Sequence, residues 1–222
     1  MAGLEIRTTP IQGLANSAEV LILGPVGSQD ARALKDVLDR LVASKAAHLS
    51  ILMKQVSYMN SAGLACLIEV SGALERRGGT LVLVEVQPKV KVVLSNLGMN
   101  RYFRFEASDE EARAFLRAQA ERLSRSPRVC PLEGPEAGVA FPVAATPIRI
   151  GSDPKSTIVV RHADVERAHA EIYLNGDRCC VKDLGSRTGT FVGDRRITDE
   201  PLKAGDVVRV AGLKLVFRAP GA

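Results

Sequence analysis

The side chains that could carry acid–base or nucleophilic chemistry are few and lie apart in the sequence. None of the three histidines, His48, His162 and His169, stands beside a serine or cysteine in a nucleophile motif. His162 and Asp164 are spaced as two metal ligands can be, but two ligands do not make a metal site. The phosphate-binding patterns G-x-x-x-x-G-K-[S/T] and G-x-G-x-x-G are absent. We therefore expect a protein that is not an enzyme and that has no metal or other cofactor.

The cysteines give a second test for metal or redox chemistry. None of the four falls in a C-x-x-C pair, and Cys179 and Cys180 are adjacent. Adjacent residues of a strand point to opposite faces, so these two make a poor metal pair. We expect small, buried, reduced thiols, as in a cytosolic protein.

Composition limits the remaining classes of function. The chain has 222 residues, enough for one large domain or two small ones, and 46% of them are hydrophobic, without a tryptophan. The net charge of +5 is mild, and the basic residues are scattered near acidic ones, so no nucleic-acid partner is expected. No apolar run is long enough to span a bilayer, and the first residues lack the pattern of a signal peptide. These features predict a cytoplasmic protein without a membrane partner.

Residues 1–119 alternate strand and helix patterns. Apolar runs predict strands over 18–23, 49–56 and 80–86, the last nearly continuous, as in a sheet buried on both faces. Helical spacing predicts helices over 28–46, 62–77, 89–97 and 109–123, the first of them with Ser28 as N-cap. The pattern indicates an α/β sandwich with a mixed sheet and helices.

The pattern changes after a linker predicted over residues 120–127, which ends near a proline. Residues 128–222 form the second predicted domain. Short β-like runs recur there, separated by turn residues, at 139–143, 147–150, 157–160, 170–174, 179–182, 207–210 and 214–217. Regular short strands with turn signals predict an all-β sandwich.

One segment of the first half combines a strand end with a helix start. It reads V-S-Y-M-N-S-A-G-L over 56–64, where Ser61 can cap the helix and Gly63 lets a neighbouring surface approach. Together with the strand before it and G-G-T-L-V-L-V after it, the segment resembles the STAS family (sulfate transporter and anti-sigma factor antagonist domains). The resemblance covers roughly residues 4–118.

The STAS resemblance implies a phosphate switch. In the family the segment reads D-S-[S/T]-G, and a partner kinase, which is also an anti-sigma factor, phosphorylates a hydroxyl there and so turns partner binding off. In this sequence Asn60 replaces the acid and Ala62 replaces the second hydroxyl, which leaves Ser61 as acceptor. The resemblance places the partner surface around Asn60, Ala62 and Gly63. Ser61 is either phosphorylated or simply a helix cap.

The second half resembles a forkhead-associated (FHA) domain over roughly residues 128–219. The resemblance rests on I-R-I-G-S at 148–152, E-R-A-H-A-E-I at 166–172, V-K-D-L-G-S-R-T-G-T-F-V at 181–192 and the closing runs at 202–210 and 215–217. Family members bind phosphothreonine peptides through loops at one end of the sandwich. An arginine and a serine hold the phosphate there, an asparagine holds the peptide backbone, and a histidine, here His169, supports the loops.

This sequence departs from the FHA pattern at all three ligand positions. Ser152 stands for the arginine, Glu166 for the serine and Thr188 for the asparagine, although Arg167 and Arg187 remain nearby. Losing a hydrogen bond to a charged group costs about 1.5–3 kcal/mol, about tenfold to hundredfold in affinity. Glu166 adds a like charge beside a phosphate.

We therefore expect the FHA loop surface to bind a non-phosphorylated protein or to pack on the other half. Glu166 is expected to pair with Arg149, Arg167 or Arg187. A spacer whose loops bind nothing is the plainest alternative.

The leading hypothesis is a bacterial signalling adaptor that resembles an anti-sigma factor antagonist. Its STAS half binds a regulatory partner, such as a kinase-like anti-sigma factor, and its FHA half binds a second protein. One alternative is a structural scaffold of a larger regulatory assembly without a phosphate cycle. Another is a phosphothreonine-peptide reader that uses Arg167 and Arg187.

Overall fold

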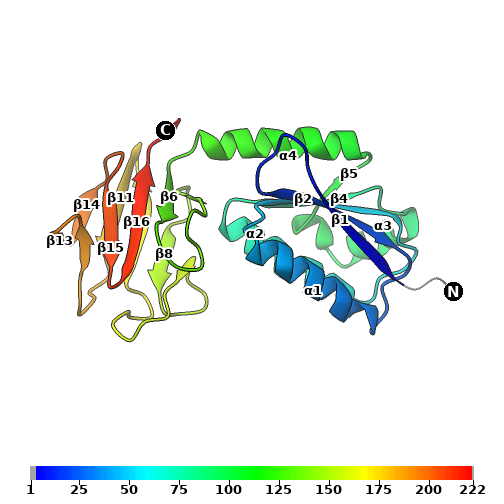
Figure 1. Ribbon diagram of the computed structural model, residues 1–222, viewed down its shortest axis with the longest axis horizontal. Coiled ribbons are helices and arrows are strands. Elements are labelled where there is room, and N and C mark those ends of the chain that lie inside the picture. Colours follow the sequence, from blue (N-terminus) through cyan, green and yellow to red (C-terminus); the bar gives the residue numbers. More distant parts are fainter. Residues whose placement is uncertain (1–3, 222) are drawn as a thin grey trace. The chain divides into compact units, whose positions relative to one another are not determined.

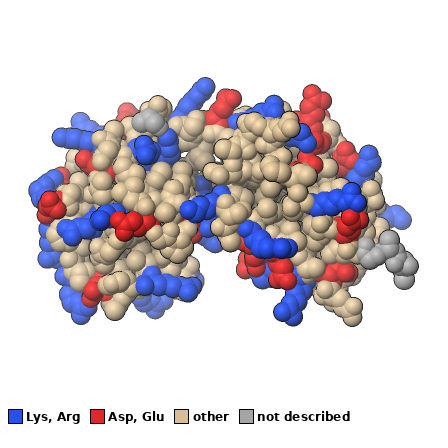
Figure 2. All heavy atoms as spheres, viewed as in Figure 1, with Lys and Arg blue, Asp and Glu red and all other residues tan. Residues whose placement is uncertain are grey.

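A computed structural model describes residues 4–221 of the chain. The chain divides into two compact units, residues 1–121 and 122–222 (Figure 1). On the face shown in Figure 2, basic and acidic side chains are interspersed on both units. None of the described helices is long and apolar enough to cross a membrane.

The first unit is built on a five-stranded mixed sheet, in the order β1-β2-β3-β4-β5. The first pair of strands is antiparallel and the other three pairs are parallel. The prediction of a mixed α/β sheet is therefore confirmed. The strands are β1 (Glu5–Pro10), β2 (Ser17–Leu23), β3 (His48–Gln55), β4 (Thr80–Val84) and β5 (Arg104–Glu106).

Helices cover both faces of this sheet (Figure 1). The helices α1, α2 and α3 bury their apolar residues in one core with strands β2, β3 and β4, while α4 packs on the opposite face. Along β4, Leu81 and Leu83 belong to the first core and Val82 and Val84 to the second. The nearly continuous apolar strand is thus buried on both faces, as predicted. The helices are α1 (Asp30–Ala43), α2 (Ser61–Arg76), α3 (Pro88–Asn96), the 3-10 turn η1 (Met99–Arg101) and α4 (Asp109–Ser124).

The prediction that Ser28 caps the first helix is wrong. Helix α1 begins at Asp30, and the N-cap residue Gln29 makes no side-chain cap hydrogen bond. Asp30 itself accepts a hydrogen bond from the backbone N–H of Gly27, at 3.0 Å. The Asp30 carboxylate, in the first turn of α1, thus gives the Gly27 N–H just before the helix an acceptor. A carboxylate at this end of a helix is also stabilised by the helix macrodipole.

The second unit is a sandwich of two sheets, β14-β11-β10-β8-β9 and β13-β12-β15-β16-β6-β7. Every pair is antiparallel except β8 with β9. One apolar cluster, which includes Phe141, Ile150 and Val181, fills the space between the sheets, and the predicted sandwich is confirmed. The strands are β6 (Arg128–Pro131), β7 (Phe141–Pro142), β8 (Ile148–Gly151), β9 (Ile158–Val159), β10 (Ala170–Asn175), β11 (Arg178–Asp183), β12 (Thr190–Val192), β13 (Arg195–Ile197), β14 (Asp199–Pro201), β15 (Val207–Val210) and β16 (Leu213–Arg218).

Most of the cysteines are buried. Cys66, Cys179 and Cys180 are buried, Cys130 is half-buried, and all four are free thiols. Cys179 faces the sandwich core, where burial raises the pKa of its thiol to about 11. A thiol with so high a pKa is almost wholly protonated at neutral pH, which makes it a poor nucleophile and metal ligand.

The sheet face under α4 carries buried polar groups. His48 and Ser50 alternate along β3 on that face, and within the described residues neither His48 Nδ1 nor Ser50 Oγ has a hydrogen-bond partner. Burial lowers the pKa of His48. The folded protein therefore favours a neutral imidazole at this position.

This burial predicts a pH dependence of stability. An unfolded histidine titrates near pH 6.5. Below that pH the unfolded chain takes up a proton that His48 resists in the fold, so the free energy of unfolding falls as the pH falls. In His48→Gln we expect a smaller loss of unfolding free energy between pH 7.5 and 5.5 than in the wild type, measured by urea unfolding. Ser50→Ala, a neighbour that does not titrate, should keep the wild-type slope. An unchanged slope in His48→Gln would contradict this role of His48.

Candidate functional site

The first candidate site lies where β3 leads into α2, and Asn60 organises it. The Asn60 Oδ1 accepts a hydrogen bond from Gly63 N–H at 2.9 Å, which makes Asn60 the N-cap of α2. Its Nδ2 donates to Ser28 Oγ at 3.0 Å, and its backbone N–H donates to the Val26 carbonyl at 3.0 Å. Asn60 thus joins the start of α2 to the loop between β2 and α1.

The prediction that Ser61 caps α2 is wrong. Ser61 is the first residue of the helix and is exposed, as is Ala62 beside it. The backbone of Asn60 is extended, with φ −83° and ψ 176°, which is the conformation that an N-cap residue requires. Ser61 is therefore not needed for capping, and its hydroxyl lies at the positive end of a helix whose first turn contains no acidic residue.

Gly63 is buried, and its small size serves the chain's own packing. A Cβ at this position would lie 2.8 Å from Val26 Cγ1 and 3.0 Å from Met59 Cγ. The surface that approaches Gly63 is therefore the loop before α1, which also forms an isolated bridge between Val26 and Met59. Asn60, Ser61 and Ala62 remain accessible around this junction, Asn60 only partly.

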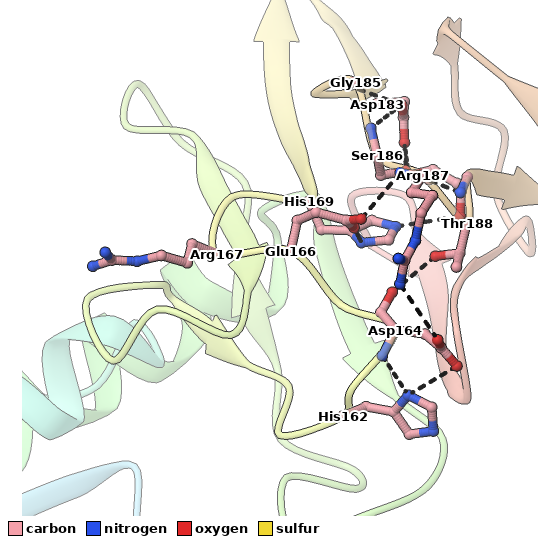
Figure 3. Close-up of polar contacts among 12 residues, drawn as sticks. His162, Asp164, Glu166, Arg167, His169, Asp183, Gly185, Ser186, Arg187 and Thr188 are labelled. Carbon is pink, nitrogen blue, oxygen red and sulfur yellow. Dashed lines mark hydrogen bonds and ion pairs between the residues drawn. The ribbon is translucent and has the colours of Figure 1, made fainter.

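The second candidate site comprises three loops of the sandwich, at residues 152–157, 160–169 and 184–189 (Figure 3). Glu166 connects two of them. Its Oε1 accepts a hydrogen bond from Arg187 N–H at 3.1 Å, and its Oε2 lies 2.7 Å from Nδ1 of the fully buried His169. The Arg187 N–H and then His169 hold the pKa of Glu166 below its usual value.

The predicted pairing of Glu166 with an arginine side chain is therefore wrong. Its contacts are a backbone N–H and a buried imidazole, and the Nε2 of that imidazole donates to the Gly189 carbonyl at 3.2 Å. The supporting role that the FHA resemblance implied for His169 agrees with this position, because the ring bridges the loop of Glu166 and the loop that ends at Gly189.

The loop of Glu166 and Arg167 also packs directly on the end of β8. A Cβ on Gly151 would lie 2.1 Å from the Arg167 carbonyl oxygen, so only glycine allows this approach. The neighbouring Ser152 N–H donates to the Glu166 carbonyl at 2.9 Å. Ser152 and Glu166 are therefore brought together through the backbone.

The two arginines do not converge on one point. Arg167 Nη2 lies 2.7 Å from Asp153 Oδ2, and its side chain points away from Glu166 and Arg187 in Figure 3. Arg187 extends toward Asp164, with Nη2 3.9 Å from Oδ1. Each arginine is thus directed to a different aspartate, and together they form no cradle for a phosphate.

The loop at 184–189 is held by Asp183, which does not belong to the predicted ligand positions. Asp183 accepts hydrogen bonds from Gly185 N–H, Ser186 N–H and the Thr190 hydroxyl, at 3.1, 2.9 and 2.7 Å. Burial alone would raise the pKa of Asp183, but bonds from Ser186 and Thr190 outweigh burial, and the pKa is lowered. This agrees with the turn-stabilising role expected for aspartates in this half.

The half-buried Thr188 bonds a neighbouring loop. Its hydroxyl donates to the Asp164 carbonyl at 2.8 Å, and Asp164 N–H donates to His162 Nδ1 at 3.2 Å. Of the predicted ligand positions, Glu166 and Thr188 use their side chains in internal contacts, and Ser152 uses its backbone N–H. Among the described residues, no group of three or more His, Cys, Asp or Glu side chains could hold a metal ion.

Comparison with known families decides what the two units are. The model of the STAS domain matches residues 18–112, and the model of the FHA domain matches residues 148–211. The chain contains a STAS domain followed by an FHA domain. Both are interaction domains without catalysis, so they support a signalling role through protein–protein contacts.

Curated relatives match only part of the chain. The oxoglutarate dehydrogenase inhibitor of Corynebacterium jeikeium is 36% identical over 84 residues, which are 38% of this chain and 58% of that protein. The glycogen accumulation regulator GarA of Mycolicibacterium smegmatis is also 36% identical over 84 residues, which are 38% of this chain and 53% of that protein. The chain thus spans little more than half the length of these relatives.

Among solved structures, one described as a putative anti-sigma factor antagonist of Thermotoga maritima is 17% identical. It covers 50% of this chain and 94% of its own, with a TM-score of 0.47.

The cap at Asn60 makes a testable prediction. In Asn60→Ala the Gly63 N–H loses its acceptor, so the free energy of unfolding should fall by about 1 kcal/mol. Asn60→Asp should keep most of the stability, because a carboxylate still accepts from Gly63 and from the Ser28 hydroxyl. Urea unfolding measures both variants. Ser61→Ala is the matched control and should stay within about 0.5 kcal/mol of the wild type; a larger loss there than in Asn60→Ala would show that Ser61 is the cap after all.

Proposed function

We propose that this protein is a bacterial signalling adaptor that resembles an anti-sigma factor antagonist. Its STAS domain binds a regulatory protein, such as a kinase-like anti-sigma factor, and phosphorylation of Ser61 weakens that contact. Its FHA domain binds a second protein without needing a phosphate. We place this activity in the cytoplasm, where such partners are found.

The position of Ser61 supports the switch. Its side chain is exposed on the first residue of α2, beside the exposed Ala62, and it contributes nothing to the helix cap. A kinase can therefore reach the hydroxyl without unfolding the helix. A phosphate there adds about −1.5 to −2 charges, which the helix N-terminus tolerates and a complementary partner surface does not.

The position of Glu166 supports phosphate-independent binding by the FHA domain. Its carboxylate already accepts the Arg187 N–H and contacts buried His169. An incoming phosphate would have to displace this carboxylate or accept its repulsion. The names of the relatives describe regulation of glycogen accumulation and inhibition of oxoglutarate dehydrogenase. We infer that this chain likewise has a regulatory role.

The STAS switch is tested in the native cell. Tagged full-length protein is purified, and mass spectrometry reads both its phosphorylation and its partners. We expect phosphate on Ser61, and at least about tenfold lower recovery of a kinase-like partner with Ser61→Asp than with Ser61→Ala. Thr8→Asp adds the same charge at an exposed position of β1 and should leave recovery unchanged. Unmodified Ser61, with equal recovery by all variants, contradicts the switch.

The scaffold alternative gives a different result in the same experiment. A scaffold without a phosphate cycle should co-purify in one large complex of fixed composition, whatever residue stands at position 61. Sedimentation of the purified material distinguishes this complex from an exchangeable pair.

The FHA loops make a separate prediction. In calorimetry with a phosphothreonine peptide library, the wild type should bind phosphorylated and unphosphorylated peptides alike. The double variant Ser152→Arg, Glu166→Ser restores two family ligands and should gain about tenfold to hundredfold in phosphopeptide affinity. Tighter binding of phosphorylated peptides by the wild type would instead establish a phosphopeptide reader that uses Arg167 and Arg187.

A further inference from the structure

Helix α3 exposes more apolar surface than its packing in the STAS domain uses. Val90 and Leu94 enter the core, but Val92, Val93 and Leu97 are 58%, 53% and 54% exposed. The other exposed large apolar residues of the described chain are distributed over separate elements. Val93 and Leu97 lie one helical turn apart and are neighbours, whereas Val92 lies on another side of the helix. Neighbouring exposed apolar side chains can mark a contact with another molecule, whereas single ones need no explanation.

The lysines of α3 form no ion pair within the described residues, although Lys91 Nζ lies 5.7 Å from the centroid of the Phe105 ring. Residues 86–105 contain no aspartate or glutamate. Lys89 and Lys91 lie near the start of the helix, whose first turn has no acidic residue, and neither lysine makes an ion pair with a described residue. The nearest acids in sequence are engaged elsewhere, because Glu85 pairs with Lys54 and Glu106 with Arg104.

Some cations on the other helices of this domain are neutralised by ion pairs. On α1, Lys35 lies 2.7 Å from Glu69 and 3.5 Å from Asp39. On α4, Arg113 lies 2.7 Å from Asp109 and 2.8 Å from Glu19. The lysines of α3 differ from these, and they also lie at the positive end of the helix dipole, which disfavours them. Negative charge from another molecule would compensate both effects.

A groove beside α3 offers room for a partner's side chain. It has a volume of about 630 Å³ and lies between the helix and β5, with Lys91 and Val92 on one side and Phe105 on the other. Strand β5 is the last strand of the sheet and pairs only with β4. The groove shares Lys91 and Val92 with the α3 surface, and its lining also includes Glu85 and Glu106, which pair with Lys54 and Arg104.

We propose that the α3 surface, made of Lys89, Lys91, Val92, Val93 and Leu97, binds an acidic segment of a partner protein. Apolar side chains of that segment cover the valines and the leucine and enter the groove, while its carboxylates pair with the two lysines. The inference rests on the proposed protein-binding role of the STAS domain but does not depend on phosphorylation of Ser61. It names the chemistry of the partner: an acidic, amphipathic segment.

A protein fits this surface better than a membrane does. Helix α3 has nine residues, about 13 Å of length, and one side of it is committed to the core through Val90 and Leu94. A helix that lies in a lipid interface buries its whole apolar face and carries a broad basic face. Two lysines on a short, fixed helix meet that requirement poorly.

The test uses the full chain and a defined probe. The probe is a synthetic amphipathic helix with leucine at positions i, i+3, i+4 and i+7 and glutamate at the exposed positions between them. A second peptide carries lysine in place of each glutamate. We expect the acidic peptide to bind and to shift the amide NMR signals of α3, and the basic peptide to bind at least about tenfold more weakly. Raising the salt concentration from about 0.05 M to about 0.5 M should weaken binding of the acidic peptide, because salt screens exposed charges.

Matched variants locate the binding. The triple variant Val92→Ser, Val93→Ser, Leu97→Ser should lose about tenfold or more in affinity for the acidic peptide, and Lys89→Glu with Lys91→Glu should reverse the preference between the two peptides. The control triple variant Leu132→Ser, Val159→Ser, Leu174→Ser removes exposed apolar side chains of the FHA domain and should bind as the wild type does. Urea unfolding confirms that each variant is folded.

Three results would overturn the proposal. The first is that the acidic peptide does not bind, or binds the α3 variants as well as the wild type. The second is that α3 signals shift with vesicles of phosphatidylglycerol and not with the acidic peptide, which would make the surface lipid-binding. The third is self-association of the wild type that the triple serine variant abolishes, which would make the occupant a second copy. All three leave the Ser61 experiment untouched, so failure here is distinct from failure of the proposed switch.

Discussion

Both candidate sites depend on close packing against a glycine, by the side chains of Val26 and Met59 at Gly63 and by a backbone carbonyl at Gly151. At the STAS junction, Gly63 lets the first turn of α2 lie against Val26. In the FHA loops, Gly151 lets the Arg167 carbonyl lie against the end of β8. A similar approach joins Gly79 to the Ala47 carbonyl, 1.8 Å from where a Cβ would lie, at the start of β4. Close-packed interiors cannot absorb an added methyl group without moving the backbone, so these contacts fix the positions of Asn60 and Glu166.

At each site, residues that depart from the family patterns have found partners within the chain. Asn60 bonds both the helix start and Ser28, Glu166 bonds the Arg187 backbone beside His169, and the Thr188 hydroxyl bonds the Asp164 carbonyl. A polar group that already has its partners gains little from a new ligand, because it must give up one contact for another. To bind a new ligand, Glu166 and Thr188 would each have to give up a contact within the chain.

The two domains differ in how charge is distributed on their exposed surfaces. The STAS domain presents an exposed hydroxyl at the positive end of α2 and an apolar, basic face on α3. In the FHA loops, two arginines are each directed to an aspartate: Arg167 lies beside Asp153, and Arg187 is directed to Asp164. Charge that is unmatched attracts a partner of opposite sign, whereas matched charge contributes mainly specificity. The proposed electrostatic contact therefore lies on the STAS domain.

The sequence by itself determined the two domains, the order of their long elements and the residues that break the family patterns. Apolar runs such as 18–23 and 80–86 predict strands because their periodicity reports burial directly. The sequence did not reveal β1, β5 or the short strands β12 to β14. These strands are only partly buried, and they form because neighbouring strands of the sheet pair with them.

Only the tertiary structure decided which residue caps α2 and which groups hold Glu166. Asn60 and Ser61 have similar capping propensities, and the extended backbone next to Val26 selects Asn60. Glu166 bonds a backbone N–H that lies 21 residues along the chain, although three arginines were available in the sequence. Which groups hydrogen-bond depends on where loops meet in space. Composition and sequence spacing carry no information about the distance between two loops.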